Sequence, residues 1–233
     1  MVSKHCKETF ARKLYADIKL EIITHRFLPG EWINVEQLSE QMRVSTTPVR
    51  EVLSRLAGEG LVELRPQFGF LMRKLSESDL VDIYKVNQQL LEWCLDEIER
   101  NRISSRSLAP CDFSGQLEVP NVQDTLSSMT LARVTGDLFA YIAVQAENVE
   151  LIAQIENIND RLFHARAWAF ELQSISHLQV QKIYDGCKNM NTELTRLAVQ
   201  EYHSSQLSLV RILIRNMDKG RLSEQKSFMA QGE

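Results

Sequence analysis

The chain has 233 residues, of which 44% are hydrophobic and 25% charged, a length and composition that suit one or two globular domains. No apolar run approaches the roughly 18 residues that a membrane-spanning helix needs, and the first residues lack the apolar core of a signal peptide, so we expect a cytoplasmic protein. The four cysteines form no CxxC pair, which argues against a zinc finger or a disulfide framework.

Charge is unevenly distributed along the chain. Residues 1–75 hold 12 Lys+Arg and 9 Asp+Glu, whereas residues 76–233 hold 15 and 22, although the net charge of the whole chain is only −4. A mildly basic N-terminal part followed by an acidic part suggests two domains with different roles. We therefore expect one domain over residues 1–75 and a second over residues 76–233.

The N-terminal part begins with two predicted helices. Over residues 7–25, apolar residues recur at three- and four-residue spacing, at Ala11, Leu14, Ile18 and Ile22. This spacing places them on one helical face. A second helix is predicted over residues 35–42, because Asn34 is a suitable N-cap and Gln37 follows it by three residues, as in a capping box.

A third helix and a hairpin complete this domain. Ser45, Thr46 and Thr47 precede Pro48, and hydroxyls followed by an early proline are typical of a helix start. The predicted buried stripe of this helix consists of Val49, Val52, Leu53 and Leu56. Residues 61–65 and 70–73 flank a turn that contains proline and glycine, which predicts a β-hairpin. This order of elements is that of a winged helix-turn-helix, whose third helix enters the major groove of DNA.

The sequence resembles the GntR family of bacterial regulators over about 60 residues. The resemblance rests on Leu28-Pro29-Gly30, Leu38-Ser39-Glu40, Val44-Ser45-Thr46-Thr47-Pro48-Val49-Arg50-Glu51-Val52-Leu53, Leu56, Glu59-Gly60-Leu61-Val62 and Gly69, in the family's order and spacing. A lone helix-turn-helix pattern is weakly specific, whereas this extended pattern is specific.

The resemblance implies a set of DNA-contacting residues. It matches Ser45, Thr46 and Thr47 to the start of the recognition helix, and it matches Arg50 to an arginine that projects into the major groove. Arginine binds guanine O6 and N7 in bidentate fashion. Gly69 matches the wing glycine. The full predicted set is Ser45, Thr46, Thr47, Arg50, Arg55, Gln67 and Gly69.

Two alternatives to these roles stay open at the sequence level. Ser45 and Thr47 are also suited to simple helix capping, and Arg50 is also suited to a solvated helix face. Thr46 departs from the family, because many members carry arginine at this position, which leaves the operator preference undetermined.

The second domain is predicted to be all-helical. Helical patterns cover residues 78–101, 122–146, 149–172, 177–187 and 191–217, with a polar connection over residues 102–123. We expect a mainly α protein: an N-terminal winged helix-turn-helix with a small β-hairpin wing, and a C-terminal antiparallel bundle of six or seven helices. Residues 78–86 and 146–151 resemble the FadR subfamily of GntR regulators, which implies a domain for ligand sensing and dimerisation.

Many bundles of that subfamily hold a divalent metal with one aspartate and three histidines. The Asp-x-x-x-His positions fall near Thr135 and Phe139, or near Asp137 and Tyr141 after a two-residue shift. His203 matches the last ligand, but Gln181 stands at the third ligand position. Because this set is incomplete, we assign no metal-ligand set and no cofactor. A divalent metal stays open as an alternative, since Asp160 and His164 have the i, i+4 spacing of a ligand pair.

Without a metal, an effector pocket needs other polar groups. Candidate pocket residues are Arg133, Asp137, His164, Gln181 and His203, with Arg161 and Arg166 as further cations on the inner helices; each is also suited to a surface or salt-bridge role. In the first helix of the bundle, Asn87 stands near a position where relatives carry an arginine.

We therefore expect a homodimeric DNA-binding regulator, more often a repressor in this family, that reads an inverted repeat and responds to a small-molecule effector. An alternative is a regulator whose bundle has lost sensing and serves only dimerisation or partner contact. An enzyme is the least favoured class, because the sequence contains no GxSxG, P-loop or HExxH motif.

Overall fold

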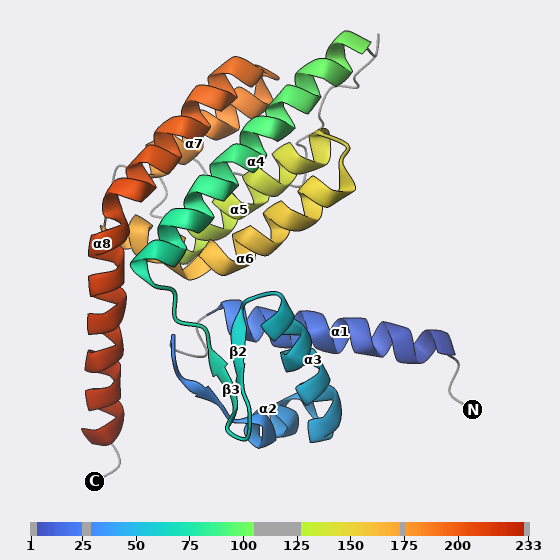
Figure 1. Cartoon of the computed structure of the whole chain (residues 1–233), viewed down its shortest axis with the longest axis vertical. Helices are drawn as coiled ribbons and strands as arrows, with labels where there is room; N and C mark the ends of the chain where they lie inside the picture. The colour runs from blue at the N-terminus through green and yellow to red at the C-terminus, as the bar shows by residue number, and fades with distance from the viewer. Residues whose placement is uncertain (1–3, 25–28, 105–126, 173–175, 231–233) are drawn as a thin grey trace. The chain divides into compact units, whose positions relative to one another are not determined.

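The computed structural model describes residues 4–24, 29–104, 127–172 and 176–230. The contacts divide the chain into two compact units, Met1–Leu75 and Ser76–Glu233. The first unit combines three helices with a small sheet, and the described part of the second unit is built from helices (Figure 1). The mainly α fold with an N-terminal winged helix-turn-helix is confirmed.

The helices of the first unit are α1 (Lys4–Ile23), α2 (Val35–Met42) and α3 (Thr46–Gly58). The predicted stripe of α3 is buried at all four positions, Val49, Val52, Leu53 and Leu56. It packs against Leu14, Ile18 and Ile22 of α1, whereas Ala11, which shares their spacing, is exposed. The periodicity of the sequence therefore identified the faces on which the core of this unit is built.

The turn between α2 and α3 is short and closely defined. Asn34 caps α2, because its Oδ1 accepts a hydrogen bond from the Gln37 amide at 2.9 Å. Arg43 ends α2 in the left-handed conformation, with φ 55°, and its N–H donates to the carbonyls of Ser39 and Glu40. Val44 then donates to Ser39 O at 3.0 Å. These bonds close the chain tightly and fix the direction in which α3 starts.

The sheet has three strands, one more than the hairpin predicted from the sequence. The predicted pair forms β2 (Val62–Arg65) and β3 (Gly69–Met72), and β1 (Trp32–Ile33) adds to the other side of β3. All pairing is antiparallel, with Trp32 opposite Leu71 and Val62 opposite Met72. A two-residue strand has no alternation of its own to detect, and its existence depends on pairing with β3.

The second unit contains five helices in its described part. They are α4 (Glu77–Ser104), α5 (Ser128–Gln145), α6 (Val149–Leu172), α7 (Ser176–Lys188) and α8 (Thr192–Ala230). The bounds of α6 match the prediction, while α4 runs three residues and α8 thirteen residues further than expected. Most of the predicted polar connection lies outside the described residues, so the expected number of six or seven helices stays a prediction.

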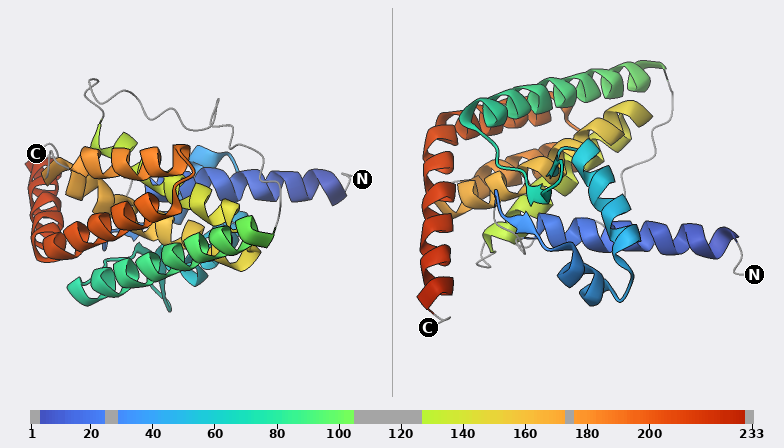
Figure 2. Two further views of the ribbon diagram at one scale, coloured as in Figure 1. Left: turned by 90° about the horizontal axis from the view of Figure 1, so that it is seen from above. Right: turned by 60° about the horizontal axis from the view of Figure 1, so that its bottom comes forward.

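Two pairs of consecutive helices in the bundle, α5 with α6 and α7 with α8, are joined by short turns. Figure 2 shows α5 and α6 side by side, and α7 and the first half of α8 packed together. Glu147, with φ 54°, turns the chain between α5 and α6, and Met190, also with φ 54°, turns it between α7 and α8. Gly186 permits the second crossing, because a Cβ there would lie 2.6 Å from Oγ1 of Thr195.

Within the described residues, no helix is both long and apolar enough to cross a membrane.

Candidate functional site

The start of α3 presents unsatisfied polar groups to solvent. Ser45 holds the N-cap position with φ −74° and ψ 165°, but its side chain makes no capping hydrogen bond. The capping role that the sequence left open for Ser45 is therefore not observed. Ser45 and Thr47 are exposed and Thr46 is half-buried. The first amides of a helix lack partners within the helix and carry the positive end of its dipole, so this end of α3 is suited to binding a phosphate.

Arg50 lies one turn further along α3 on the exposed side. About half of its side chain is accessible, and its Nη2 lies 3.6 Å from Oε1 of Glu36 on α2. Both partners are exposed, so this ion pair contributes little stability and is readily exchanged for another anion or a base edge. The structure thus leaves Arg50 able to reach outward from the recognition helix.

Arg55 has a different environment from Arg50. Its guanidinium lies over the ring of Tyr15 at 3.9 Å, and its Nε donates to Glu59 at 3.1 Å. Tyr15 also donates to Glu59, at 2.6 Å, and Lys19 lies 3.4 Å from the same carboxylate. Burial opposes ionisation of Glu59, but the hydrogen bond from Tyr15 and the charge of Lys19 hold its pKa below the usual value. This network joins α1 to the end of α3, and it includes Arg55, whose side chain is 65% exposed and whose predicted contact with DNA stays a prediction.

The turn between β2 and β3 forms the tip of the wing. Gln67 has φ 69° and Gly69 has φ 104°, a backbone region that L side chains rarely adopt. Gln67 is exposed, and beside it Phe68 is 77% exposed, with its ring centroid 6.2 Å from that of Trp32 on β1. The wing therefore places a polar side chain and an exposed aromatic ring at its tip.

A helix-turn-helix with an exposed, anion-attracting recognition helix and a three-stranded wing defines the protein as a DNA-binding regulator of the winged-helix class. The sequence pattern described as "Bacterial regulatory proteins, gntR family" matches residues 10–72. The HTH-type transcriptional regulator YdhC of Bacillus subtilis is 31% identical over 160 residues, which cover 66% of this chain and 68% of YdhC. The chain belongs to the GntR family, and it is a regulator and not an enzyme.

Other relatives agree with this assignment. The Nta operon transcriptional regulator of Aminobacter aminovorans is 28% identical over 158 residues, which cover 67% of this chain and 73% of that protein. The solved structure of E. coli McbR/YncC superimposes with a TM-score of 0.62, covering 91% of this chain and 98% of that one at 17% identity, which shows a shared fold. The described part of the second unit is helical, as the resemblance to the FadR subfamily predicts.

In the bundle, two of the positions matched to metal ligands carry side chains that bind no metal. Thr135 and Phe139 are fully buried, and the Thr135 hydroxyl donates to the Leu131 carbonyl. Asp137, the alternative position, lies on the surface of α5, where Oδ2 is 3.6 Å from the Arg133 guanidinium. Among the described residues, no group of three histidine, cysteine, aspartate or glutamate side chains is arranged to hold a metal ion. The metal of the subfamily does not fit these residues.

His203 is the buried centre of an aromatic and polar cluster. Its Nδ1 lies 2.8 Å from the Val199 carbonyl and its Nε2 lies 3.0 Å from the Asn87 side chain. Phe139 stacks on the imidazole, and Tyr84 and Tyr202 meet it edge-on. Burial and the nearby Arg166 cation lower the pKa of His203 to about 4, although the bond to Val199 opposes the shift. His203 is thus neutral near pH 7, and its Nδ1 donates to the Val199 carbonyl.

The five residues predicted to form the effector pocket do not share one site. Arg133 and Asp137 lie at the surface of α5. Gln181 donates to Asp185 on exposed α7 surface, and His164 is partly exposed on α6 beside Phe163. His203 is fully buried, so it cannot line the same enclosed site as the solvent-facing Arg133.

Other buried polar side chains surround His203 instead. Asn87 of α4, Arg166 of α6 and Gln206 of α8 are each at most 1% exposed, and they are joined by Tyr84 and Tyr202. The sequence had drawn attention to Asn87 and Arg166 but not to the other three. The spacing of these three residues could have identified them, because it places polar side chains on the apolar faces of their helices. Tyr202 and Gln206, for example, are four residues apart on α8.

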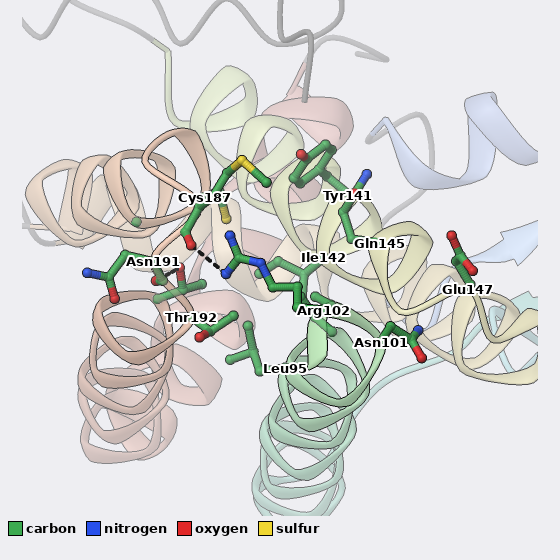
Figure 3. Close-up of a pocket in the computed structure, with 14 residues that line it drawn as sticks. Leu95, Asn101, Arg102, Tyr141, Ile142, Gln145, Glu147, Cys187, Asn191 and Thr192 are labelled. Atoms are coloured by element: carbon green, nitrogen blue, oxygen red, sulfur yellow. Dashed lines mark hydrogen bonds between the residues drawn. The ribbon is translucent and has the colours of Figure 1, made fainter. Parts of the chain in front are cut away.

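A separate pocket of about 110 Å³ opens where the ends of α4 and α5 meet the turn between α7 and α8 (Figure 3). Leu95, Ile142 and Cys187 supply apolar walls. Figure 3 shows the Arg102 side chain crossing this space, and its Nη1 donates to the Met190 carbonyl at 2.7 Å. The sequence did not predict this pocket, because its walls come from four helices.

Proposed function

We propose that the protein is a homodimeric transcriptional repressor that binds an inverted-repeat operator and is released by a small-molecule effector held in the second unit. The observation that supports it most is the exposed start of α3, where the Ser45 hydroxyl caps nothing and Arg50 has only a surface partner. We propose Ser45, Thr46, Thr47, Arg50, Arg55, Gln67 and Gly69 as the DNA-contacting set. Since the partner is chromosomal DNA, the protein acts in the cytoplasm.

Repression has support among the relatives. The E. coli protein GlaR, 28% identical over 116 residues, is named an HTH-type transcriptional repressor. A dimer that covers an operator next to a promoter excludes the polymerase without any further contact, so repression requires nothing beyond the DNA-binding unit and a dimer contact.

Dimerisation is supported by apolar side chains on the surface of the bundle. Val86 and Trp93 are each about half exposed and stand seven residues apart on α4, and Leu194 and Leu197 are about half exposed on α8, which packs against α4. Exposed apolar side chains on two helices that pack together offer a candidate contact surface. Light scattering of the full chain measures the stoichiometry directly.

The recognition helix is tested by a salt-titrated binding assay with the DNA upstream of the gene. Arg50→Ala should weaken specific binding by about 1–3 kcal/mol and relax the preference at one base pair. Arg12→Ala, which removes the same charge from an exposed position of α1, is the matched control. If Arg50→Ala leaves the affinity for the specific DNA unchanged, the assignment of α3 as the recognition helix is wrong.

The alternative, a bundle that serves only dimerisation, is favoured by the loss of the metal ligands at Thr135 and Phe139. It predicts that no metabolite stabilises the protein. A thermal-shift screen against metabolite classes tests this, because a ligand that binds only the folded state raises Tm.

A further inference from the structure

Both cations of the recognition helix α3 lie beside an acidic side chain. Arg55 donates to Glu59 at the end of its own helix, whereas Arg50 lies 3.6 Å from Oε1 of Glu36, which belongs to α2. In the described part of the chain, Glu36 is the only acidic side chain that forms an ion pair with Arg50. A group proposed to face DNA therefore has a carboxylate next to it, and the phosphates of DNA repel a carboxylate.

The helix-turn-helix that contains this pair carries no net charge. Its residues 34–58 hold three acidic side chains, Glu36, Glu40 and Glu51, and three basic ones, Arg43, Arg50 and Arg55. Attraction between basic side chains and phosphates supplies most of the affinity that a protein has for DNA of any sequence. This attraction is weak within the motif, so binding through it depends on directed contacts.

Glu36 also changes one of the two helix starts in the motif. It lies in the first turn of α2, where its charge interacts favourably with the positive end of the helix dipole. The first turn of α3 contains no acidic residue. The start of α3 is therefore suited to a phosphate, whereas the charge of Glu36 opposes a phosphate at the start of α2.

Both members of the pair are open to solvent. The side chain of Arg50 is 52% exposed and that of Glu36 is 69% exposed. In water such a pair is weak, because the solvent screens both charges. When DNA covers the pair, water leaves and the effective dielectric constant falls, so each charge interacts more strongly with its neighbours. The pair should therefore affect DNA binding more than it affects folding.

A phosphate and a guanine affect this pair differently. If Arg50 turns to a phosphate, it leaves Glu36, and the carboxylate stays unpaired beside DNA of like charge. A guanine edge is neutral and accepts two N–H bonds, at O6 and N7. Because the guanidinium has five N–H donors, Arg50 can bind guanine with one edge and keep Glu36 on another.

We propose that Glu36 is a specificity-determining residue, which holds Arg50 for a guanine edge in the major groove and opposes its use on phosphates. The inference rests on the proposed function, because it takes α3 as the recognition helix. Specificity is a difference between two affinities, so a group that weakens binding to the wrong DNA increases it. Glu36 acts through Arg50 and needs no contact with a base, so it is a positioning residue.

The test uses the full chain, a duplex selected from a random pool on the immobilised wild-type protein, and a scrambled duplex of equal length. Glu36→Gln keeps the size of the side chain and removes its charge. It should bind the scrambled duplex more tightly and lower the ratio of specific to non-specific affinity by about tenfold. Because the released Arg50 then contacts a phosphate, the slope of log K against log salt for the scrambled duplex should steepen by about 0.9.

Three further variants separate this role from a general effect of charge. Glu40→Gln removes the same charge from an exposed position of α2 that forms no ion pair with Arg50, so it should keep the wild-type ratio and slope. In an Arg50→Ala background, Glu36→Gln should change neither quantity, because the group that it positions is absent. Glu36→Asp keeps the charge and should retain most of the base preference when the selection is repeated.

The proposal is overturned if Glu36→Gln keeps the wild-type ratio and slope, if Glu40→Gln shifts them equally, or if the shift persists in the Arg50→Ala background. Each of these results leaves the recognition helix in place, provided that Arg50→Ala itself weakens specific binding. If the selection enriches no sequence, or if Arg50→Ala leaves the specific affinity unchanged, the proposed function fails as well.

Discussion

The imidazole ring of His203 lies almost parallel to the phenyl ring of Phe139, with centroids 5.6 Å apart and an interplanar angle of 22°. Phe139 stands at a position matched to a metal-binding histidine of the subfamily. A phenyl ring cannot bind a metal, and the second nitrogen of His203 already faces Asn87. One histidine among rings and amides does not hold a divalent ion against water.

Metal should accordingly have no effect on this protein. Chelation should leave Tm and operator affinity unchanged, because no described cluster offers three ligands. The measurement is Tm with and without chelator and with added Zn²⁺ or Mn²⁺, alongside metal analysis of the purified protein. His203→Gln is the matched control, since a metal effect that survives in it does not involve this residue. Stoichiometric metal that resists dialysis and depends on His203 contradicts the prediction.

Ser45 and Asn34 make a matched pair of helix N-caps. Asn34→Ala should lower the free energy of unfolding by about 1 kcal/mol, because it removes a capping bond to Gln37. Ser45→Ala should change stability by much less, because the Ser45 hydroxyl makes no capping bond, but it should weaken DNA binding. Denaturant unfolding and operator titration of both variants give the comparison. If Ser45→Ala destabilises the unit as much as Asn34→Ala does, the hydroxyl is a cap after all.

The wing turn depends on a glycine with positive φ. Gly69→Ala should destabilise the first unit by about 1–2 kcal/mol, because φ 104° is strained for an L side chain even though no atom crowds its Cβ. Gly58→Ala is the control: it lies at the end of α3 with no neighbour within 4 Å and no positive φ. That substitution should be neutral or stabilising by up to about 1 kcal/mol. Equal effects of the two changes in denaturant unfolding would show that the turn tolerates a side chain.

Acid should destabilise the bundle through His203. The folded-state pKa, about 4, lies below the ordinary 6.5, so the unfolded chain binds the extra proton first as pH falls. Above pH 6.5 the buried neutral ring does not lower the free energy of unfolding. As pH falls from 6.5 towards 4, protonation of the unfolded chain lowers the free energy of unfolding by roughly 3 kcal/mol at most. Burial is the main cause of the lowered pKa, and the Arg166 cation adds to it, whereas the hydrogen bond to the Val199 carbonyl and the charge of Glu92 oppose it.

The pH dependence is measured by denaturant unfolding of the wild type and of His203→Gln at several pH values. The variant should lose the part of the slope between pH 6.5 and 4 that belongs to this ring. His177→Gln, at a half-exposed position of α7, should keep the wild-type profile. If His203→Gln keeps the pH dependence of the wild type, the destabilisation by acid does not come from protonation of this imidazole.

The sequence by itself determined the elements whose signals are local. The stripe of α3, the cap of α2 and the bounds of α6 follow from spacing and capping within a single helix, and the structure has them as predicted. The order of these elements, together with the family resemblance, was enough to identify a winged-helix regulator.

The tertiary structure alone decided what depends on residues far apart in the chain. The strand β1 exists because Trp32–Ile33 pairs with β3, about forty residues later. The guanidinium of Arg55 lies over the ring of Tyr15, a contact between residues forty positions apart that helical spacing does not predict. Arg166 was one of several cations that were equally plausible as surface groups, and only the convergence of α4, α5, α6 and α8 buries it. A residue's neighbours across the fold set its desolvation and its hydrogen bonds, and helical periodicity carries no information about them.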